Sequence, residues 1–225
     1  GNNQDYWRLR TDEYNPAAPV GQDGRWRWVM YDMDFCFGLF GVDSAIVHNM
    51  LELATAPDGP DYPNPPWSTF LLRKFLENEN FRISFINRFA DLLNTNFLPD
   101  RMIASIEPFQ QLIEAEVSEH ILRWKNLYHF EHWKTRIETL KVFARQRPTH
   151  QRQHILDYFD LSGTYNVTLD VSNKWHGHVR INSIEISENT PGTNDNPYPW
   201  VGAYFLEIPI ELEAVPAYGY AFSHW

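Results

Sequence analysis

The spacing of apolar residues changes once along this chain of 225 residues, and that change limits the fold more than any other feature. From residue 67 to about 160 apolar residues recur every three or four positions, as in Phe85, Phe89 and Leu92, which is the period of a helix with one buried face. After Gly163 short runs alternate apolar and polar residues, which is the period of a strand. The chain is therefore predicted to be α+β, with helices and strands in separate stretches.

The helical stretch has room for about four or five helices of ordinary length. Asn94 to Pro99 predicts a break between the first two long helices, and Arg147-Pro148 predicts another before a last helix that ends near Phe159, because proline disfavours helix at the residue before it. The alternating runs predict strands at residues 165–171, 178–181, 183–186 and 208–214. A helical bundle followed by a small β domain is the expected order.

The first part of the chain adds a predicted β-hairpin. Residues 4–10 and 25–35 have the composition of two strands, and proline and glycine recur between them, which favours turns and loops. We expect a domain boundary near residue 162, so that residues 1–162 form one domain and residues 163–225 form a small β domain.

The composition argues against several classes of protein. The formal net charge is −10, and sequence-independent binding of nucleic acid needs clustered lysine and arginine, so we expect no nucleic-acid partner. A transmembrane helix needs about eighteen apolar residues in a row, and because none occurs we predict no transmembrane segment. The single cysteine, Cys36, excludes an intrachain disulfide and is expected to pack inside the fold.

Both ends of the sequence look cut. The chain opens on Asn2-Asn3, with neither a charged region nor an apolar region typical of a signal peptide, and runs directly into Tyr6-Trp7. It ends in the middle of a pattern at Trp225. We expect the chain to be a fragment of a longer protein.

One stretch combines aromatic residues and carboxylates in a pattern that suggests chemistry. Its alternating residues share one face if the segment is a regular strand; they are Trp26, Trp28, Met30, Asp32 and Asp34. The six residue steps from Trp26 to Asp32 would span roughly 20 Å, which is long enough for a flat base at one end and a metal-bound phosphate at the other. The pattern predicts a nucleotide site with a metal at its carboxylate end.

These features also have structural explanations. An Asp-x-Asp pair at a strand end, taken alone, is more often a capping or turn feature than a metal site, and only its setting here favours a metal. His129 and His132 are spaced as in a helical metal site, but no third ligand is visible, which favours a surface pair. Arg145, Arg147 and Arg152 could bind phosphate, although cations near a helix C-terminus are favourable in any case.

Taken together, these motifs resemble the spore-coat protein H (CotH) kinase family, whose members are atypical secreted or surface kinases related to the protein-kinase fold. The resemblance covers nearly the whole chain and is most specific in residues 26–38 and 80–97. Further matching residues are Arg123-Trp124, Trp133, residues 143–148 and Tyr158-Phe159. The segment from Glu211 to Trp225 is similar to the divergent internalin-type repeats that often follow such kinases in surface proteins.

The resemblance implies roles for four residues. Asp32 stands where a kinase aspartate binds the Mg²⁺ or Mn²⁺ ion that bridges the ATP phosphates, and Asp34 is its close alternative. Trp26 matches a tryptophan expected to stack on adenine, and Asn3 matches the asparagine that reaches a second metal ion. The catalytic aspartate that precedes such an asparagine would lie before the first residue of this chain. The resemblance thus implies an atypical kinase-like C-terminal lobe, a β-hairpin plus helical bundle, that is inactive alone.

The function implied is transfer of the ATP γ-phosphate to serine or threonine of an exported or surface protein, with the protein itself extracellular or on the cell surface. The alternative is a non-catalytic surface adhesion or binding scaffold with a degenerate kinase-like lobe. A third possibility is that Asp32 and Asp34 bind Ca²⁺ and only stabilise a loop.

Overall fold

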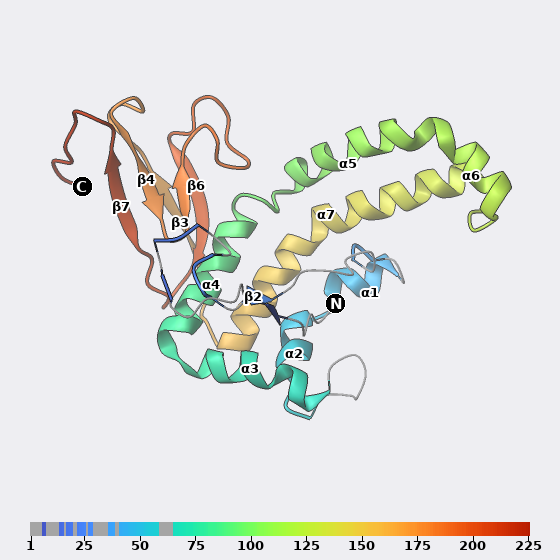
Figure 1. The fold of residues 1–225 in the computed structure, drawn as a ribbon, viewed down its shortest axis with the longest axis horizontal. Helices are drawn as coiled ribbons and strands as arrows, with labels where there is room; N and C mark the ends of the chain where they lie inside the picture. Colours follow the sequence, from blue (N-terminus) through green and yellow to red (C-terminus); the bar gives the residue numbers. More distant parts are fainter. Residues whose placement is uncertain are drawn as a thin grey trace.

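The structure is a computed structural model of the chain, and it describes residues 6–7, 14–15, 17–19, 22–25, 27–28, 36–38, 41–58 and 65–225. Helices occupy the middle of the described chain and antiparallel strands its last quarter, so the predicted α+β class is confirmed. The strands of the last quarter lie at one end of the molecule, and the longest helix packs beside a second long helix in an arm that reaches the other end (Figure 1).

Four helices follow one another in the first half of the chain. They are α1 (Val42–Val47), α2 (Met50–Thr55), α3 (Pro66–Glu77) and α4 (Glu79–Leu93). Asn78 ends α3 and begins α4, since its side chain accepts a hydrogen bond of 3.0 Å from the backbone N–H of Phe81. An asparagine cap of this kind satisfies one of the free N–H groups of a helix start. The short gap therefore turns the chain sharply between α3 and α4.

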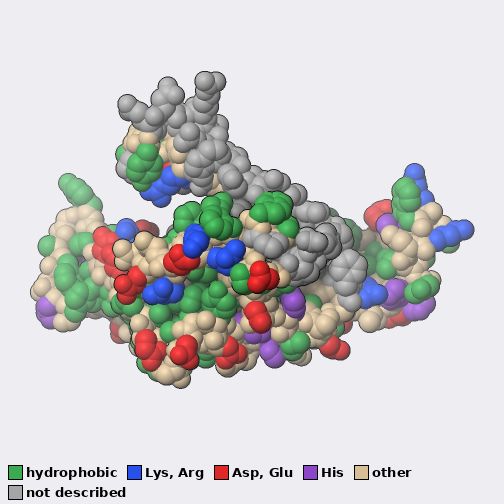
Figure 2. Space-filling model, turned by 90° about the horizontal axis from the view of Figure 1, so that it is seen from below, with side chains coloured by type: hydrophobic (Ala, Val, Ile, Leu, Met, Phe, Trp, Pro, Cys, Tyr) green, Lys and Arg blue, Asp and Glu red, His purple; other side chains and the backbone are tan. Residues whose placement is uncertain are grey.

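The helical arm is built from α5 (Pro99–Ile113), the 3-10 turn η2 (Glu114–Glu116), α6 (Val117–Trp124) and α7 (Phe130–Phe159). At its far end hydrophobic side chains lie beside Lys, Arg and His residues (Figure 2), and Tyr128 is 87% exposed there. No helix of the described residues is both long and apolar enough to cross a membrane.

The predicted break at Arg147-Pro148 is wrong, because α7 is one helix of 30 residues with Pro148 inside it. Proline removes one intrahelical hydrogen bond and usually ends or kinks a helix. Here tertiary packing outweighs that cost: Ala144 is fully buried, and Arg147 donates hydrogen bonds to the end of α1.

The strands after residue 163 form two small antiparallel sheets, which with their connecting loops we call the β module. In one sheet β3 (Thr164–Leu169) pairs with β6 (Trp200–Phe205) over their full lengths. In the other the order is β5 (Ile184–Ile186), β4 (Gly177–Ile181) and β7 (Leu212–Pro216). Near the start of the chain β1 (Tyr6–Trp7) pairs with β2 (Arg27–Trp28) inside the predicted hairpin.

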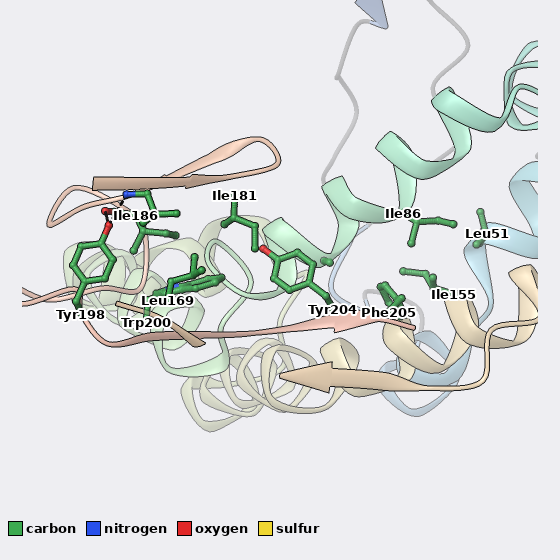
Figure 3. Packing of buried hydrophobic residues seen from close by; sticks show 12 residues of the cluster. Leu51, Ile86, Ile155, Leu169, Ile181, Ile186, Tyr198, Trp200, Tyr204 and Phe205 are labelled. Carbon is green, nitrogen blue, oxygen red and sulfur yellow. Dashed lines mark hydrogen bonds between the residues drawn. The ribbon is translucent and has the colours of Figure 1, made fainter. Parts of the chain in front are cut away.

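A continuous hydrophobic core joins the β module to the helices (Figure 3). Tyr204 and Phe205 of β6 are fully buried, and Phe205 lies close to Ile86 of α4 and Ile155 of α7. At the other end of the same cluster Tyr198 donates a hydrogen bond of 2.6 Å to the carbonyl of Ile186. The division into domains of residues 1–162 and 163–225 stays a prediction, and the buried core crosses it.

Candidate functional site

The four predicted site residues, Asn3, Trp26, Asp32 and Asp34, lie outside the described residues. The chain on either side of the motif is described in part, from β2 before the carboxylates and from Cys36 after them. The metal and nucleotide roles stay predictions, while the structure shows how these flanking segments are held.

The segment before the motif is held by an ion pair. The Arg27 guanidinium donates hydrogen bonds of 2.8 and 2.7 Å to the two carboxylate oxygens of Asp23. These bonds lower the pKa of Asp23 to about 2, so the carboxylate is charged at neutral pH. Arg27 also lies opposite Trp7 in the β1–β2 pair. The ion pair therefore ties β2 to the loop that precedes it.

The segment after the motif turns tightly onto α1 and α7. Phe37 and Gly38 both have positive φ angles, of 58° and 82°. A Cβ atom on Gly38 would lie 2.8 Å from the Cα of Val42 in α1, so glycine is required both for its backbone angle and for its close approach. The Phe37 ring lies 5.1 Å from the ring of Phe143 in α7. The chain is thus anchored four residues after Asp34.

Arg147 holds α1 against α7. One guanidinium nitrogen, Nη1, donates to the carbonyls of Ile46 and His48 at 2.8 and 2.7 Å, and reaches that of Ala45 at 3.3 Å. The other, Nη2, donates to the Gln151 side chain at 2.9 Å. These carbonyls end a helix, where a cation is favourable. Burial lowers the pKa of Arg147, but an arginine side chain keeps its charge in proteins.

His154 lies further along α7 and also faces α1. It is buried, and its Nδ1 atom has no hydrogen-bond partner among the described residues. Burial, together with the positive charge of Arg147, lowers its pKa below the usual 6.5, while a hydrogen bond with the backbone of Val47 acts in the opposite direction. The imidazole is therefore neutral at pH 7, as a site beside a buried guanidinium requires.

A second polar cluster joins α4 to the β module, and we call it the α4 junction. Its α4 residues are Asn87, Arg88, Asp91 and Asn94. Asp91 is fully buried and accepts hydrogen bonds from the Tyr204 hydroxyl at 2.9 Å and from the backbone N–H of Ser183 at 3.1 Å.

Two further donors complete the shell around Asp91. The Ser183 hydroxyl donates to its carboxylate at 2.5 Å, and the Asn182 amide donates at 3.3 Å. A buried carboxylate is costly unless donors surround it, and here they do. Burial and the Asp91 carboxylate raise the pKa of Tyr204, so the phenol keeps the proton that it donates.

The side-chain amide of Asn94 forms two hydrogen bonds with the backbone of β6, in the way that the backbone of a neighbouring strand would. Its amide nitrogen donates to the Ala203 carbonyl at 2.9 Å, and its oxygen accepts from the Ala203 N–H at 3.0 Å. Arg152 of α7 donates to the same Asn94 oxygen at 2.7 Å and to the same carbonyl at 3.2 Å. The structure therefore favours a structural role over phosphate binding for Arg147 and Arg152.

The sequence analysis did not identify the α4 junction. A signal was present, because Asn87, Asp91 and Asn94 recur at helical spacing and so share one face of α4. Of the two histidines proposed as a surface pair, His129 caps α7: its Nδ1 accepts a hydrogen bond of 3.1 Å from the backbone N–H of His132. In the described part of the chain no three potential ligands gather to hold a metal ion.

Comparison with known families gives a match over residues 2–150 to the CotH kinase protein family. The matched stretch is well over half of the chain and includes the Trp26–Gly38 motif, α4 and Arg147. The chain belongs to the CotH kinase family. No curated protein and no solved structure matches it. The CotH match ends before the β module, so the likeness of residues 211–225 to internalin-type repeats stays a prediction.

Proposed function

We propose that this CotH family chain binds ATP together with Mg²⁺ or Mn²⁺ and takes part in phosphate transfer. The observation that carries the proposal is the CotH kinase match over residues 2–150. Asp32 is assigned to the ion that bridges the phosphates, Asp34 is its alternative, and Asn3 is assigned to a second ion. Trp26 is assigned to stacking on the adenine.

The donor set suits this chemistry. Mg²⁺ and Mn²⁺ prefer oxygen ligands, and two carboxylates and one amide supply them. When bound, the ion neutralises charge on the phosphates, and the chain's own contribution is to fix the ligands. The described anchors on both sides, Asp23 with Arg27 and Gly38 with Val42, support such a fixed arrangement.

We further propose that the phosphate acceptor is a serine or threonine hydroxyl of an exported or surface protein, and that the protein is extracellular or on the cell surface. The γ-phosphoryl group would pass from ATP to the hydroxyl oxygen, leaving ADP, while a general base takes the hydroxyl proton. None of the assigned residues is that base, so they account for binding and charge neutralisation only.

The proposal is tested by ATP binding to the full-length protein as Mn²⁺ is varied. Asp32→Ala is expected to abolish Mn²⁺-dependent binding with the melting temperature nearly unchanged, whereas the matched control Asp195→Ala, at an exposed position of the β module, should bind normally. Unimpaired binding by Asp32→Ala would contradict the assignment. A melting temperature that rises with Ca²⁺ while ATP adds nothing would favour a structural calcium site.

One observation favours the alternative of a binding scaffold. The β module has an open cavity of about 350 Å³ whose lining includes His176, Tyr220, Phe222 and Trp225. The His176 and Tyr220 rings stack at 4.1 Å, and exposed aromatic faces of this kind bind sugars or protein partners. A scaffold would bind its partner equally well with Asp32→Ala and without ATP.

A further inference from the structure

We propose that Arg147 is a positioning residue for the metal site, an inference that rests on the proposed function. Arg147 acts through what we call the α1 clamp: the side chains of Phe143, Arg147 and His154 on α7, together with residues 36–38 and 41–48, which they contact. The clamp fixes the chain that leaves Asp32 and Asp34, and so limits where the carboxylates can lie.

The first step of the argument is chain length. Gly38 follows Asp34 by four residues, and an extended chain spans at most about 3.5 Å per residue. Four residue steps of extended chain reach at most about 14 Å. Only three residues connect Asp34 to Gly38 along the chain, and the proposal is that the position of Gly38 restricts Asp34 through this short connection.

The second step is that Gly38 moves with α1. Its carbonyl accepts a hydrogen bond of 3.0 Å from the N–H of Gly41, and the carbonyl of Gly41 in turn accepts one from Ala45. A Cβ on Gly38 would lie 2.8 Å from the Cα of Val42, so the Gly38 backbone lies close against the first turn of α1. The turn after the motif is therefore fixed relative to α1.

The third step is that α1 is not stable without its contacts to the rest of the fold. It has only six residues and no side-chain cap at its start, and an isolated helix of that length is unstable in water. What holds it is burial of Ile46 and the hydrogen bonds from Arg147 to its last carbonyls. Phe143 adds the ring contact with Phe37. The anchor of the motif is therefore on α7, more than a hundred residues later in the chain.

The geometry requires arginine rather than lysine. The planar guanidinium reaches three carbonyls with one nitrogen and Gln151 with the other. Lysine has a single ammonium group, which cannot donate hydrogen bonds both to the carbonyls of α1 and to Gln151 in this way. A substitution Arg147→Lys keeps the positive charge and most of the volume, so it tests the position of α1 rather than the presence of a cation.

The test is ATP binding to full-length Arg147→Lys over a range of Mn²⁺ concentrations, well below its melting temperature. We expect the Mn²⁺ concentration for half-maximal binding to rise about tenfold, because small displacements of ligands are costly. The matched control is Arg152→Lys on the same helix, which also loses hydrogen bonds to a carbonyl and a side-chain oxygen, but at the α4 junction. It should lower the melting temperature without changing the Mn²⁺ requirement.

The outcomes separate this inference from the proposed function. If Asp32→Ala abolishes binding and Arg147→Lys leaves the Mn²⁺ requirement unchanged, or if both lysine variants raise it equally, the positioning role is wrong and the metal assignment stands. If Asp32→Ala binds normally, the proposed function fails first. Should Arg147→Lys not fold, Phe143→Leu tests the same clamp through Phe37, and an unchanged Mn²⁺ requirement there overturns the inference.

Discussion

Asp91 shows how a single residue can join two parts of this protein. Its carboxylate is fully buried and takes its donors from Tyr204, Asn182 and Ser183, all in the β module. Arg88 donates to the Ser183 hydroxyl at 2.7 Å while that hydroxyl donates to Asp91, so a serine links the charges of two α4 side chains. The polar residues of α4 thus hold the β module in one orientation.

We predict that Asp91→Asn destabilises the protein by about 1–3 kcal/mol, because the new amide N–H group faces donors and leaves at least one of them without an acceptor. Chemical denaturation of the variant measures the change in the free energy of unfolding. Asp195→Asn, at an exposed position, should change it by less than about 0.5 kcal/mol. Equal stability of Asp91→Asn and the parent would show that the buried charge is not needed at the α4 junction.

At the scale of elements, the contact between α1 and α7 combines a charged arginine with a neutral histidine. Arg147 and His150 disfavour the protonated form of His154, and Asp157 favours it. The net effect, led by burial, is a pKa below 6.5 in the folded protein. The folded state therefore binds fewer protons at His154 than the unfolded state does at mildly acidic pH.

The sign of the pH effect follows from this difference. The stability linked to His154 is complete above about pH 6.5 and is lost as the pH falls through the lower pKa of the folded state. Melting temperatures from pH 7.5 down to 5 should fall more steeply for the parent than for His154→Gln. His176→Gln in the β module should keep the parent's slope. Parallel curves for the parent and His154→Gln would rule out this histidine as the cause.

The elements also show where sequence reasoning succeeded and where it failed. Apolar spacing predicted the helical stretch from α3 onward and most strands, but not α1 and α2, because each longer element buries one face and the period records that face. The rule that proline ends or kinks a helix failed at Pro148, because contacts of α7 with α1 outweigh the cost of the proline. Sequence reasoning also missed β6, because Trp200–Phe205 contains no charged or amide residue and so shows no apolar–polar alternation; within it, a Cβ on Gly202 would meet the Trp200 ring and Asn94. Contacts between distant residues decide both cases.

At the scale of the whole molecule, the buried core runs without a break from the β module into the helices. Ile86, Ile155 and Phe205 are all fully buried in one cluster. Much of that surface would face water if the β module separated, and buried apolar area is the main source of folding free energy. The α4 junction adds hydrogen bonds across the same boundary. We therefore expect the described lobe and the β module to unfold together.

Calorimetry and two optical probes test this expectation. Circular dichroism, which follows helix content, and tryptophan fluorescence should report the same single unfolding transition. The calorimetric and van't Hoff enthalpies of that transition should be equal. Two separated transitions would instead support independent domains with a boundary near residue 162. Of the candidate site, the motif and its proposed chemistry could be predicted from the sequence, whereas the contacts of Phe143 and Arg147 with the segment after the motif depend on how α7 packs beside α1.

The central claim is that Asp32 serves a metal-dependent phosphate transfer in a CotH family protein. The most direct measurement is transfer of labelled phosphate from ATP by the full-length protein, with Mn²⁺ or Mg²⁺ and protein acceptors, compared with Asp32→Ala and Asp195→Ala. We predict transfer that requires the ion, is lost in Asp32→Ala and persists in Asp195→Ala. Transfer that survives in Asp32→Ala, or none from a well-folded parent with any acceptor, would contradict the claim.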